Sequence, residues 1–500
     1  TPPSSIAPTV ILTVAIANSV HVLVTFYHNM REGMEKVPAM VESMRVNLQP
    51  VFLTSLTTSI GFLSMNFSDV PPFNHLGNFV AIGVMMSFLL AVTFQPAVIS
   101  LLPVKVRVHH EGGDRMMIWL GDFVVKNRRK ILPGLVILVV FVVSFLPRNE
   151  LNDVFLEYFD DTIPFRQATD FTVENLTGMY LIDFSIESTE TGGISDPGFQ
   201  QEVENFANWF RQQPETIHVN VFTDIMKRLN RNMHGDDDEM YRLPDDRNLA
   251  AQYLLMYEMS LPYGLDLNNQ INVDKSATRM VVTLKTISTN NMLELEKRSD
   301  QWIAENTQHI KAASASGPTM MFAHIGKRNI ISMLGGTTIA LVLISLIMIV
   351  ALRSFKLGLT SMVPNLVPAA MGFGIWGMLV GEVGLALSVV TSMTLGIVVD
   401  DTVHYMSKYQ RARVEKGYDS EQAVRYAFTS VGRALVVTSV VLIAGFLVLA
   451  FSAFKLNSGM GLLTALVIAL ALLADFLLLP TLLMKIEDKS NEKNSTVTTA

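Results

Sequence analysis

The sequence LALSVVTSMTLGIVVDDTVH, at residues 385–404, places two adjacent carboxylates, Asp400 and Asp401, inside an apolar run. His404 follows them by one helical turn. A charge at bilayer depth costs roughly 2.5 to 3.5 kcal/mol even on the most lenient scale, so ionisable residues there usually mark functional sites. The stretch therefore predicts a membrane helix that carries a functional site. Polar contacts with a purely structural role are the alternative.

The composition extends this interpretation to the whole chain. Half of the 500 residues are hydrophobic and 17% are charged, whereas about 25% are charged in an average soluble domain. We predict a polytopic α-helical membrane protein, because nine apolar runs are long enough to cross a hydrocarbon core about 30 Å thick. These runs lie at residues 6–27, 50–68, 76–102, 131–147, 331–352, 358–380, 385–406, 434–454 and 460–484. The chain has no cysteine, which excludes disulfides and thiolate metal sites.

Basic residues are distributed unevenly among the predicted loops. Residues 104–130, 353–356 and 408–433 are rich in Lys and Arg, whereas the intervening loops contain one lysine, Lys455. Short cytoplasmic loops are enriched in Lys and Arg. This pattern predicts that residues 104–130 form a basic cytoplasmic linker and that residues 148–330 lie on the non-cytoplasmic side.

An internal repeat organises the membrane part of the chain. Residues 33–99 align without a gap with residues 417–483, and Gly, Pro and Thr-Ser positions stay in register. The aligned positions include Thr54-Ser55 with Thr438-Ser439, Gly61 with Gly445, and Pro96 with Pro480. After a one-residue shift upstream, Asn18 aligns with Asp401 and His21 with His404. We therefore predict two parallel repeats with function at their interface.

The segment 148–330 differs in character from the rest of the chain. Strand-like alternation occurs at residues 180–187 and 279–287, and further short strands are predicted at 218–222 and 318–323. Helices are predicted at residues 197–213, 245–259 and 290–310. The order strand, helix, strand occurs twice, which predicts an α+β ferredoxin-like domain built from split β-α-β units.

The motif TLGIVVDDTVHY at residues 394–405, the duplicated last helix with its Pro, and the α+β insertion after the first span of a repeat resemble the resistance-nodulation-division (RND) superfamily. Within it, the chain is more similar to the MMPL (mycobacterial-membrane-protein-large) and Patched-like exporters, which contain sterol-sensing-type helix bundles, than to the drug-efflux pumps. The resemblance implies proton-driven export of hydrophobic or amphiphilic, lipid-like molecules across a bacterial inner membrane, with a periplasmic porter domain. A complete member has twelve spans and two such domains, so we expect this chain to be N-terminally truncated.

The resemblance also implies that carboxylates in the central helices carry the protons. Asp400 and Asp401 match this motif, whereas Asn18 occupies the place where many members have the first-repeat Asp. His404 lies three and four residues beyond the aspartates, on the same helix face as either one. We predict a proton relay formed by Asp400, Asp401, His404, Asn18 and His21.

Several further residues are expected around this relay. Gly396 should let the equivalent helix of the other repeat pack closely. The hydroxyl groups expected to support the carboxylates, or merely to pack helices, belong to Thr54, Ser55, Thr438 and Ser439. Asp475, in the last span, is a candidate second proton site, although packing is the simpler interpretation.

The predicted domains follow from these assignments. They are residues 1–103 (three spans of the first repeat), 104–130 (the linker), 131–147 (the first span of the second repeat), 148–330 (the α+β domain), 331–484 (five spans) and 485–500 (a cytoplasmic tail). We expect no enzyme activity, metal site or nucleic-acid partner, and no cofactor other than the proton as coupling ion. The expected partners are membrane lipid and an amphiphilic substrate, with a homo-oligomer left open. The alternative function is a lipid sensor or signalling protein without transport.

Overall fold

The computed structural model describes residues 3–104, 115–262 and 265–487. It divides into two compact units, one formed by residues 1–150 with 328–500 and the other by residues 151–327. The division lies within a few residues of the expected bounds of the α+β domain, 148 and 330. The expected tail at 485–500 falls mainly outside the described residues, as does the linker segment 105–114.

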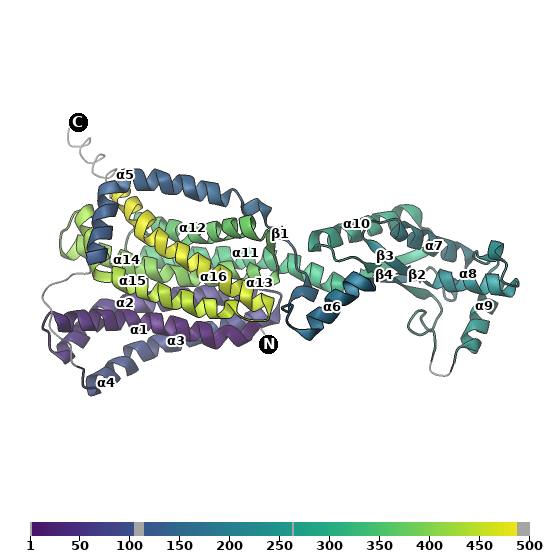
Figure 1. Ribbon diagram of the computed structural model, residues 1–500, viewed down its shortest axis with the longest axis horizontal. Coiled ribbons are helices and arrows are strands. Elements are labelled where there is room, and N and C mark those ends of the chain that lie inside the picture. The colour runs from purple at the N-terminus through teal and green to yellow at the C-terminus, as the bar shows by residue number, and fades with distance from the viewer. Residues whose placement is uncertain (1–2, 105–114, 263–264, 488–500) are drawn as a thin grey trace. The chain divides into compact units, whose positions relative to one another are not determined.

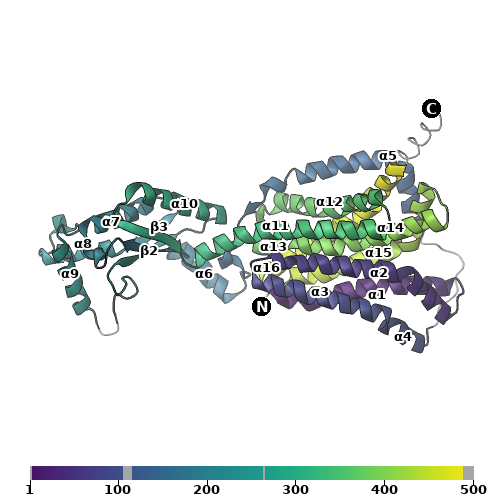
Figure 2. The same cartoon turned by 180° about the vertical axis from the view of Figure 1, so that it is seen from behind.

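The first unit is a bundle of long helices (Figure 1). Its helices are α1 (Ala7–Arg31), α2 (Lys36–Leu63), α3 (Pro71–Val92), α4 (Phe94–Leu101), α5 (Arg115–Val143), α11 (Pro318–Ala351, which begins in the second unit), α12 (Phe355–Leu379), α13 (Leu385–Ser388), α14 (Val390–Glu415), α15 (Ser420–Ala450) and α16 (Lys455–Leu473). The helices α1, α2 and α3 gather along one side of the bundle, as the view from behind also shows (Figure 2).

Within the described residues, eight helical segments are long and apolar enough to cross a membrane, one fewer than the nine predicted spans. The difference is α2, which contains residues 50–63 of the predicted span at 50–68 and ends at Leu63. Polar residues of α2 such as Asn47, Thr54 and Ser55 are buried inside the bundle. They lower the mean hydropathy of α2 without being exposed to lipid, so a composition test misses this helix.

Helix α14 packs closely against α2. A Cβ built on Gly61 would lie 2.6 Å from the Cα of Gly396, and the Thr58 hydroxyl donates to the Gly396 carbonyl at 2.7 Å. The helix expected to approach Gly396 was α1, the repeat equivalent of α14, and this prediction was wrong. Instead α1 packs on α15, where a Cβ on Gly445 would meet Thr13 at 2.5 Å. Small residues thus permit two crosswise helix contacts.

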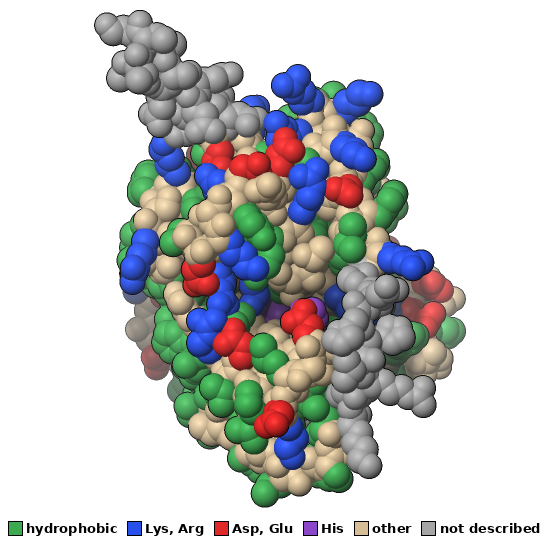
Figure 3. Space-filling view, turned by 90° about the vertical axis from the view of Figure 1, so that its left-hand side faces the viewer, with side chains coloured by type: hydrophobic (Ala, Val, Ile, Leu, Met, Phe, Trp, Pro, Cys, Tyr) green, Lys and Arg blue, Asp and Glu red, His purple; other side chains and the backbone are tan. Residues whose placement is uncertain are grey.

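Residues 115–130, expected to belong to a linker, are helical and continue without interruption into the membrane span of α5. This part of α5 packs on the start of α15, where Gly121 faces Phe428 and Arg425 bonds Asp122 at 2.8 Å. Lys and Arg side chains gather on the face of the helical unit that Figure 3 shows. The segment therefore has apolar contacts that a basic loop would lack.

The second unit contains a four-stranded sheet. Its strands are β2 (Tyr180–Ser188), β3 (Thr216–Asn220), β4 (Ala277–Leu284) and β5 (Ile310–Ser316), arranged in the order β3-β4-β2-β5 with every pair antiparallel. The helices α6 (Pro164–Asn175), α7 (Pro197–Arg211), α8 (Phe222–Met233), α9 (Arg247–Ser260) and α10 (Thr289–Asn306) accompany it. Residues of β2 are alternately buried and exposed, so one face of the sheet packs on the core.

The strand expected at 318–323 is instead the first part of α11. Pro318 follows Gly317, whose φ of +108° suits glycine, and proline is well tolerated in the first turn of a helix. The strand lies just upstream, as β5, at the place where a helix had been expected to end.

Glu202 of α7 joins that helix to the start of β5. Its carboxylate accepts hydrogen bonds from the backbone N–H groups of Gln308, His309 and Ile310 at 2.8 to 3.0 Å, and lies 2.8 Å from Nδ1 of His309. Burial opposes ionisation of Glu202, but these bonds outweigh it and hold the pKa of Glu202 below its usual value. The hydrogen bond to Glu202 raises the pKa of His309.

We predict that Glu202→Gln weakens the protection of the Gln308–Ile310 amides by about 1–3 kcal/mol, because charge-assisted bonds become neutral ones. Hydrogen exchange in the full chain measures this. Ionised Glu202 contributes fully above about pH 4.3 and loses its contribution as pH falls through the lowered pKa. Protonated His309 contributes fully below about pH 6.5 and loses its contribution as pH rises through the raised pKa. The effect should therefore be largest between about pH 4.3 and 6.5.

The control is Gln201→Ala, on the exposed face of α7. Equal protection of the Gln308–Ile310 amides in wild type and in Glu202→Gln would refute the contact.

We also predict that Gly61→Ala lowers the free energy of unfolding by about 1–3 kcal/mol, because the added methyl group forces α2 and α14 apart. Thermal unfolding of the purified chain in detergent measures the effect. Gly335→Ala is the matched control, since a Cβ on Gly335, also in a membrane helix, meets nothing within 4 Å. An equal midpoint for both variants would show that the two helices do not approach closely.

Candidate functional site

Two histidines from distant parts of the chain meet at the centre of the helical unit. The rings of His21 on α1 and His404 on α14 are stacked, with centroids 3.5 Å apart and planes within 6°. Both side chains are buried, at 1% and 0% exposure. The two positions aligned by the repeat are thus in direct contact.

Asp400 lies across from both rings. Its Oδ2 is 4.0 Å from Nε2 of His21, and its Oδ1 is 3.6 Å from Nε2 of His404. Both separations exceed a direct hydrogen bond. Within the described residues, Nε2 of His21, both ring nitrogens of His404 and Oδ1 of Asp400 have no hydrogen-bond partner. Buried polar atoms without partners are costly, so this site is suited to receive a proton, a water molecule or an ion.

The same three residues have the spacing of metal ligands. One ligating atom from each of His21, Asp400 and His404 lies within 4.8 Å of the others. Two imidazoles and a carboxylate would suit a first-row transition metal. They would equally suit the exchange of one proton between two bases and an acid.

Asp401 faces a different neighbour. Ser439 on α15 donates to its Oδ2 at 2.7 Å. In the first repeat, Asn18 donates to the aligned serine, Ser55, at 3.2 Å, and also to Ser87 at 3.3 Å. Each repeat thus bonds its central polar residue to a serine on its own next helix.

A small cavity joins Asp400 to the first repeat. Its volume is about 10 Å³, which is room for about one water molecule. The polar residues around it are Asn18, Thr54, Thr58 and Asp400, and the apolar ones are Val14, Ala17, Ile397 and Leu442. Asn18 therefore shares a cavity with Asp400, although its amide nitrogen bonds the two serines.

The structure thus brings together His21, His404 and Asp400 of the predicted relay, and places Asp401 and Asn18 beside it. Of the predicted supporting hydroxyls, Ser439 and Ser55 bond the relay residues. The hydroxyls of Thr54 and Thr438 donate to carbonyls of their own helices, at Val51 and Ala434. Thr54 also lines the cavity.

A buried lysine on the same helix was not predicted from the sequence. Lys408 is 5% exposed and follows His404 by four residues, as His404 follows Asp400. Spacing of four places all three on one face of α14. That spacing was visible in the sequence, but Lys408 was assigned to the basic loop.

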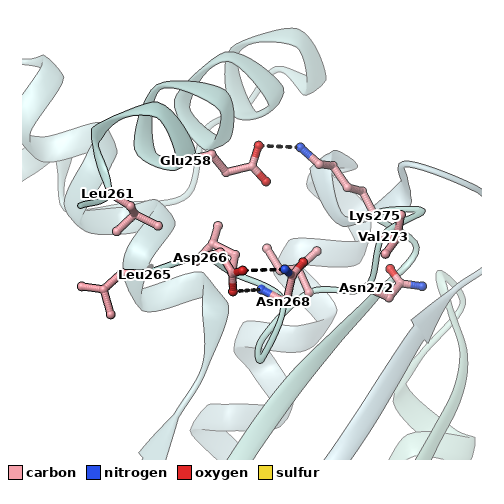
Figure 4. Close-up of a pocket in the computed structure, with 10 residues that line it drawn as sticks. Glu258, Leu261, Leu265, Asp266, Asn268, Asn272, Val273 and Lys275 are labelled. Carbon is pink, nitrogen blue, oxygen red and sulfur yellow. Dashed lines mark hydrogen bonds and ion pairs between the residues drawn. The ribbon is translucent and has the colours of Figure 1, made fainter. Parts of the chain in front are cut away.

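The second unit offers a separate cavity of about 290 Å³ beyond the end of α9 (Figure 4). Its polar side chains bind one another, since Lys275 contacts Glu258 at 2.8 Å and Asn268 donates to Asp266 at 2.6 Å. Leu261 and Leu265 add apolar surface. The cavity therefore has an amphiphilic lining.

Comparisons with known proteins agree with this fold. The family model for the MMPL family matches residues 4–131 and 212–493. A membrane protein of Methanocaldococcus jannaschii is 28% identical over 148 residues, which are 30% of this chain and 38% of that protein.

Two solved structures share the fold. The crystal structure of SecDF in its super-membrane-facing form has a TM-score of 0.56 and 12% identity, and the match covers 99% of this chain and 56% of that one. The cryo-EM structure of the hedgehog release protein Disp from the water bear Hypsibius dujardini has a TM-score of 0.65 and 16% identity, covering 97% and 64%. The chain thus spans less than two thirds of each of these three proteins.

Because the family model matches more than half of the residues and the helices form a multi-pass membrane bundle, the chain belongs to the MMPL family.

Proposed function

We propose that this protein is a proton-driven secondary transporter that exports hydrophobic or amphiphilic, lipid-like molecules. The observation that carries the proposal is the contact of His21 with His404, beside Asp400. Titratable groups from the two repeats meet there, at bilayer depth. Such groups are typical of proton pathways in pumps and transporters.

The geometry suggests how a proton would change the packing. Two parallel imidazoles 3.5 Å apart cannot both carry a charge at low cost. The pair and Asp400 would therefore share protons as one coupled unit. Gain or loss of a proton changes the attraction between α1 and α14, which belong to different repeats. A transporter needs such a link between charge and the relative position of its halves.

Asp401 would tune this unit. Its carboxylate is one residue away and is held by Ser439 on α15, which also packs on α1. A change in the charge of Asp401 would therefore alter the contacts of α15, which packs against α1, the helix that carries His21. We propose that this unit works with protons alone, without a metal, another cofactor or enzyme activity.

We further propose a bacterial inner membrane as the location, with the second unit as a periplasmic, ferredoxin-like porter domain. Two observations support this. Basic side chains gather on one face of the helical unit (Figure 3), as expected for a cytoplasmic face. The cavity beyond α9 combines leucines with paired polar groups, a lining compatible with an amphiphile. Disp is described as a hedgehog release protein, which is consistent with a role in export.

The second candidate function is a lipid sensor that does not transport. A passive sensor has no need for unpaired titratable groups at the centre of its bundle. The partnerless nitrogens of His21 and His404 therefore favour transport.

We predict that Asp400→Asn lowers proton-driven transport by about 10²-fold, the effect typical of removing a proton-transfer group. The full-length protein in liposomes, loaded with a fluorescent fatty acid and given an imposed pH gradient, measures this with and without a protonophore. Asp122→Asn is the control, because Asp122 bonds Arg425 on a half-exposed surface. Transport by Asp400→Asn that still follows the gradient would contradict the proposal.

A second expectation concerns metal ions. Chelation with EDTA should leave gradient-driven transport unchanged, because protons and not a metal occupy the site formed by His21, Asp400 and His404. Loss of transport in EDTA, with recovery on adding Zn²⁺, would contradict the proton assignment.

The wild-type protein also separates the two candidate functions. Saturable binding of the fatty acid without gradient-driven movement would support the lipid sensor instead of the transporter.

A further inference from the structure

A third buried carboxylate, Asp475, lies apart from the histidine pair. It is 0% exposed and belongs to the π-helical segment Ala474–Leu478, which follows α16. Single π-helical turns occur frequently at functional sites. The repeat alignment places Ala91 at the corresponding position, so the first repeat has no equivalent acid.

Asp475 belongs to a chain of three polar groups from three elements. The Thr402 hydroxyl on α14 lies 2.7 Å from Oδ1 of Asp475 and 2.9 Å from Oδ1 of Asn365 on α12. All three residues are buried, at 0%, 0% and 3% exposure. This network was not anticipated from the sequence, because the three residues are far apart along the chain.

The number of protons in this network decides which group donates each of its two hydrogen bonds. A hydroxyl has a single proton, so Thr402 cannot donate to both oxygens. If Asp475 carries a proton, its Oδ1–H donates to Thr402, and Thr402 donates to Asn365. One added proton then completes both short contacts. With the Asn365 amide turned over, its nitrogen would donate to Thr402 and Thr402 to an ionised Asp475.

The surroundings of Asp475 disfavour the ionised form. Within the described part of the chain, no Lys, Arg or His forms an ion pair with Asp475, and its Oδ2 has no hydrogen-bond partner. Within the described residues, the ionisable groups that act on it lie on α14. They are Asp401, Asp400 and Tyr405, whose hydroxyl also lacks a partner. Asn365 faces it from α12. A buried charge with one hydrogen bond and two acidic neighbours is strongly disfavoured.

We propose that Asp475, Thr402 and Asn365 form a second proton-binding site, in which Asp475 holds the proton and Thr402 passes its hydrogen bond on to Asn365. Thr402 directly follows Asp401 on α14, so the two sites share one helix. Loss of the proton from Asp475 would add a negative charge near Asp401 and reverse the direction of the hydrogen-bond chain. Through this charge and through α14, binding or loss of the proton at Asp475 would affect the proton-relay residues.

Infrared difference spectroscopy of the full chain in lipid tests the proposal without a transport assay. A protonated carboxyl gives a C=O stretching band that an ionised one lacks. We expect such a band near neutral pH in wild type and in Asp400→Asn and Asp401→Asn, and its loss in Asp475→Asn. Thr402→Val should keep the band but shift its frequency, because the hydrogen bond from the carboxyl proton is gone.

The matched control is Thr464→Val, another fully buried threonine of the membrane unit, on α16. A carboxyl band that is unchanged in both Asp475→Asn and Thr402→Val would overturn the proposal. If Asp475→Asn does not fold, an unshifted band in Thr402→Val suffices to overturn it. These outcomes do not depend on transport, so the second site and the proton-driven mechanism can fail separately.

Discussion

The enclosure of the apolar part of α14 within the bundle is the constraint on which the site depends. Of its most apolar window, 89% of the residues are buried, far more than in the peripheral α5, at 6%. Successive residues of an α-helix point about 100° apart. Asp400, Asp401 and Thr402 therefore face three different neighbours, and each polar side chain must find its partner inside the protein. A helix with one face in lipid could not carry three consecutive polar residues in this way.

That enclosure is achieved by crosswise packing of the two aligned segments. Gly61 admits Gly396, and Gly445 admits Thr13, so α14 is held by a first-repeat helix and α1 by a second-repeat helix. The stacked rings of His21 and His404 lie where the two central helices meet. The scaffold is thus similar in both segments, but the acids are not. In the repeat alignment, Asn18 corresponds to Asp401 and Ala91 corresponds to Asp475. The acids that we propose to bind protons are thus concentrated in the second segment.

Much of this arrangement could be predicted from the sequence. The cost of burying charge identified Asp400 and Asp401, and the alignment identified His21 and Asn18 as their counterparts. The partner of Gly396 was predicted wrongly because a repeat shows which residues correspond but not which helices exchange contacts. The prediction of a strand at 318–323 was wrong because proline suits the first turn of a helix as well as the edge of a strand, and Pro318 begins α11. Asn365 and Thr402 could not be paired with Asp475 without knowledge of the helix packing.

The central claim is that His21 and His404 form one proton-sharing pair across the bundle. Solid-state NMR of the histidine-labelled protein in lipid bilayers tests it most directly. We predict a cross-peak between two imidazoles that disappears in both His21→Gln and His404→Gln, and ring nitrogens that change protonation together during a pH titration. The absence of that cross-peak, or two rings that titrate independently, would contradict the account.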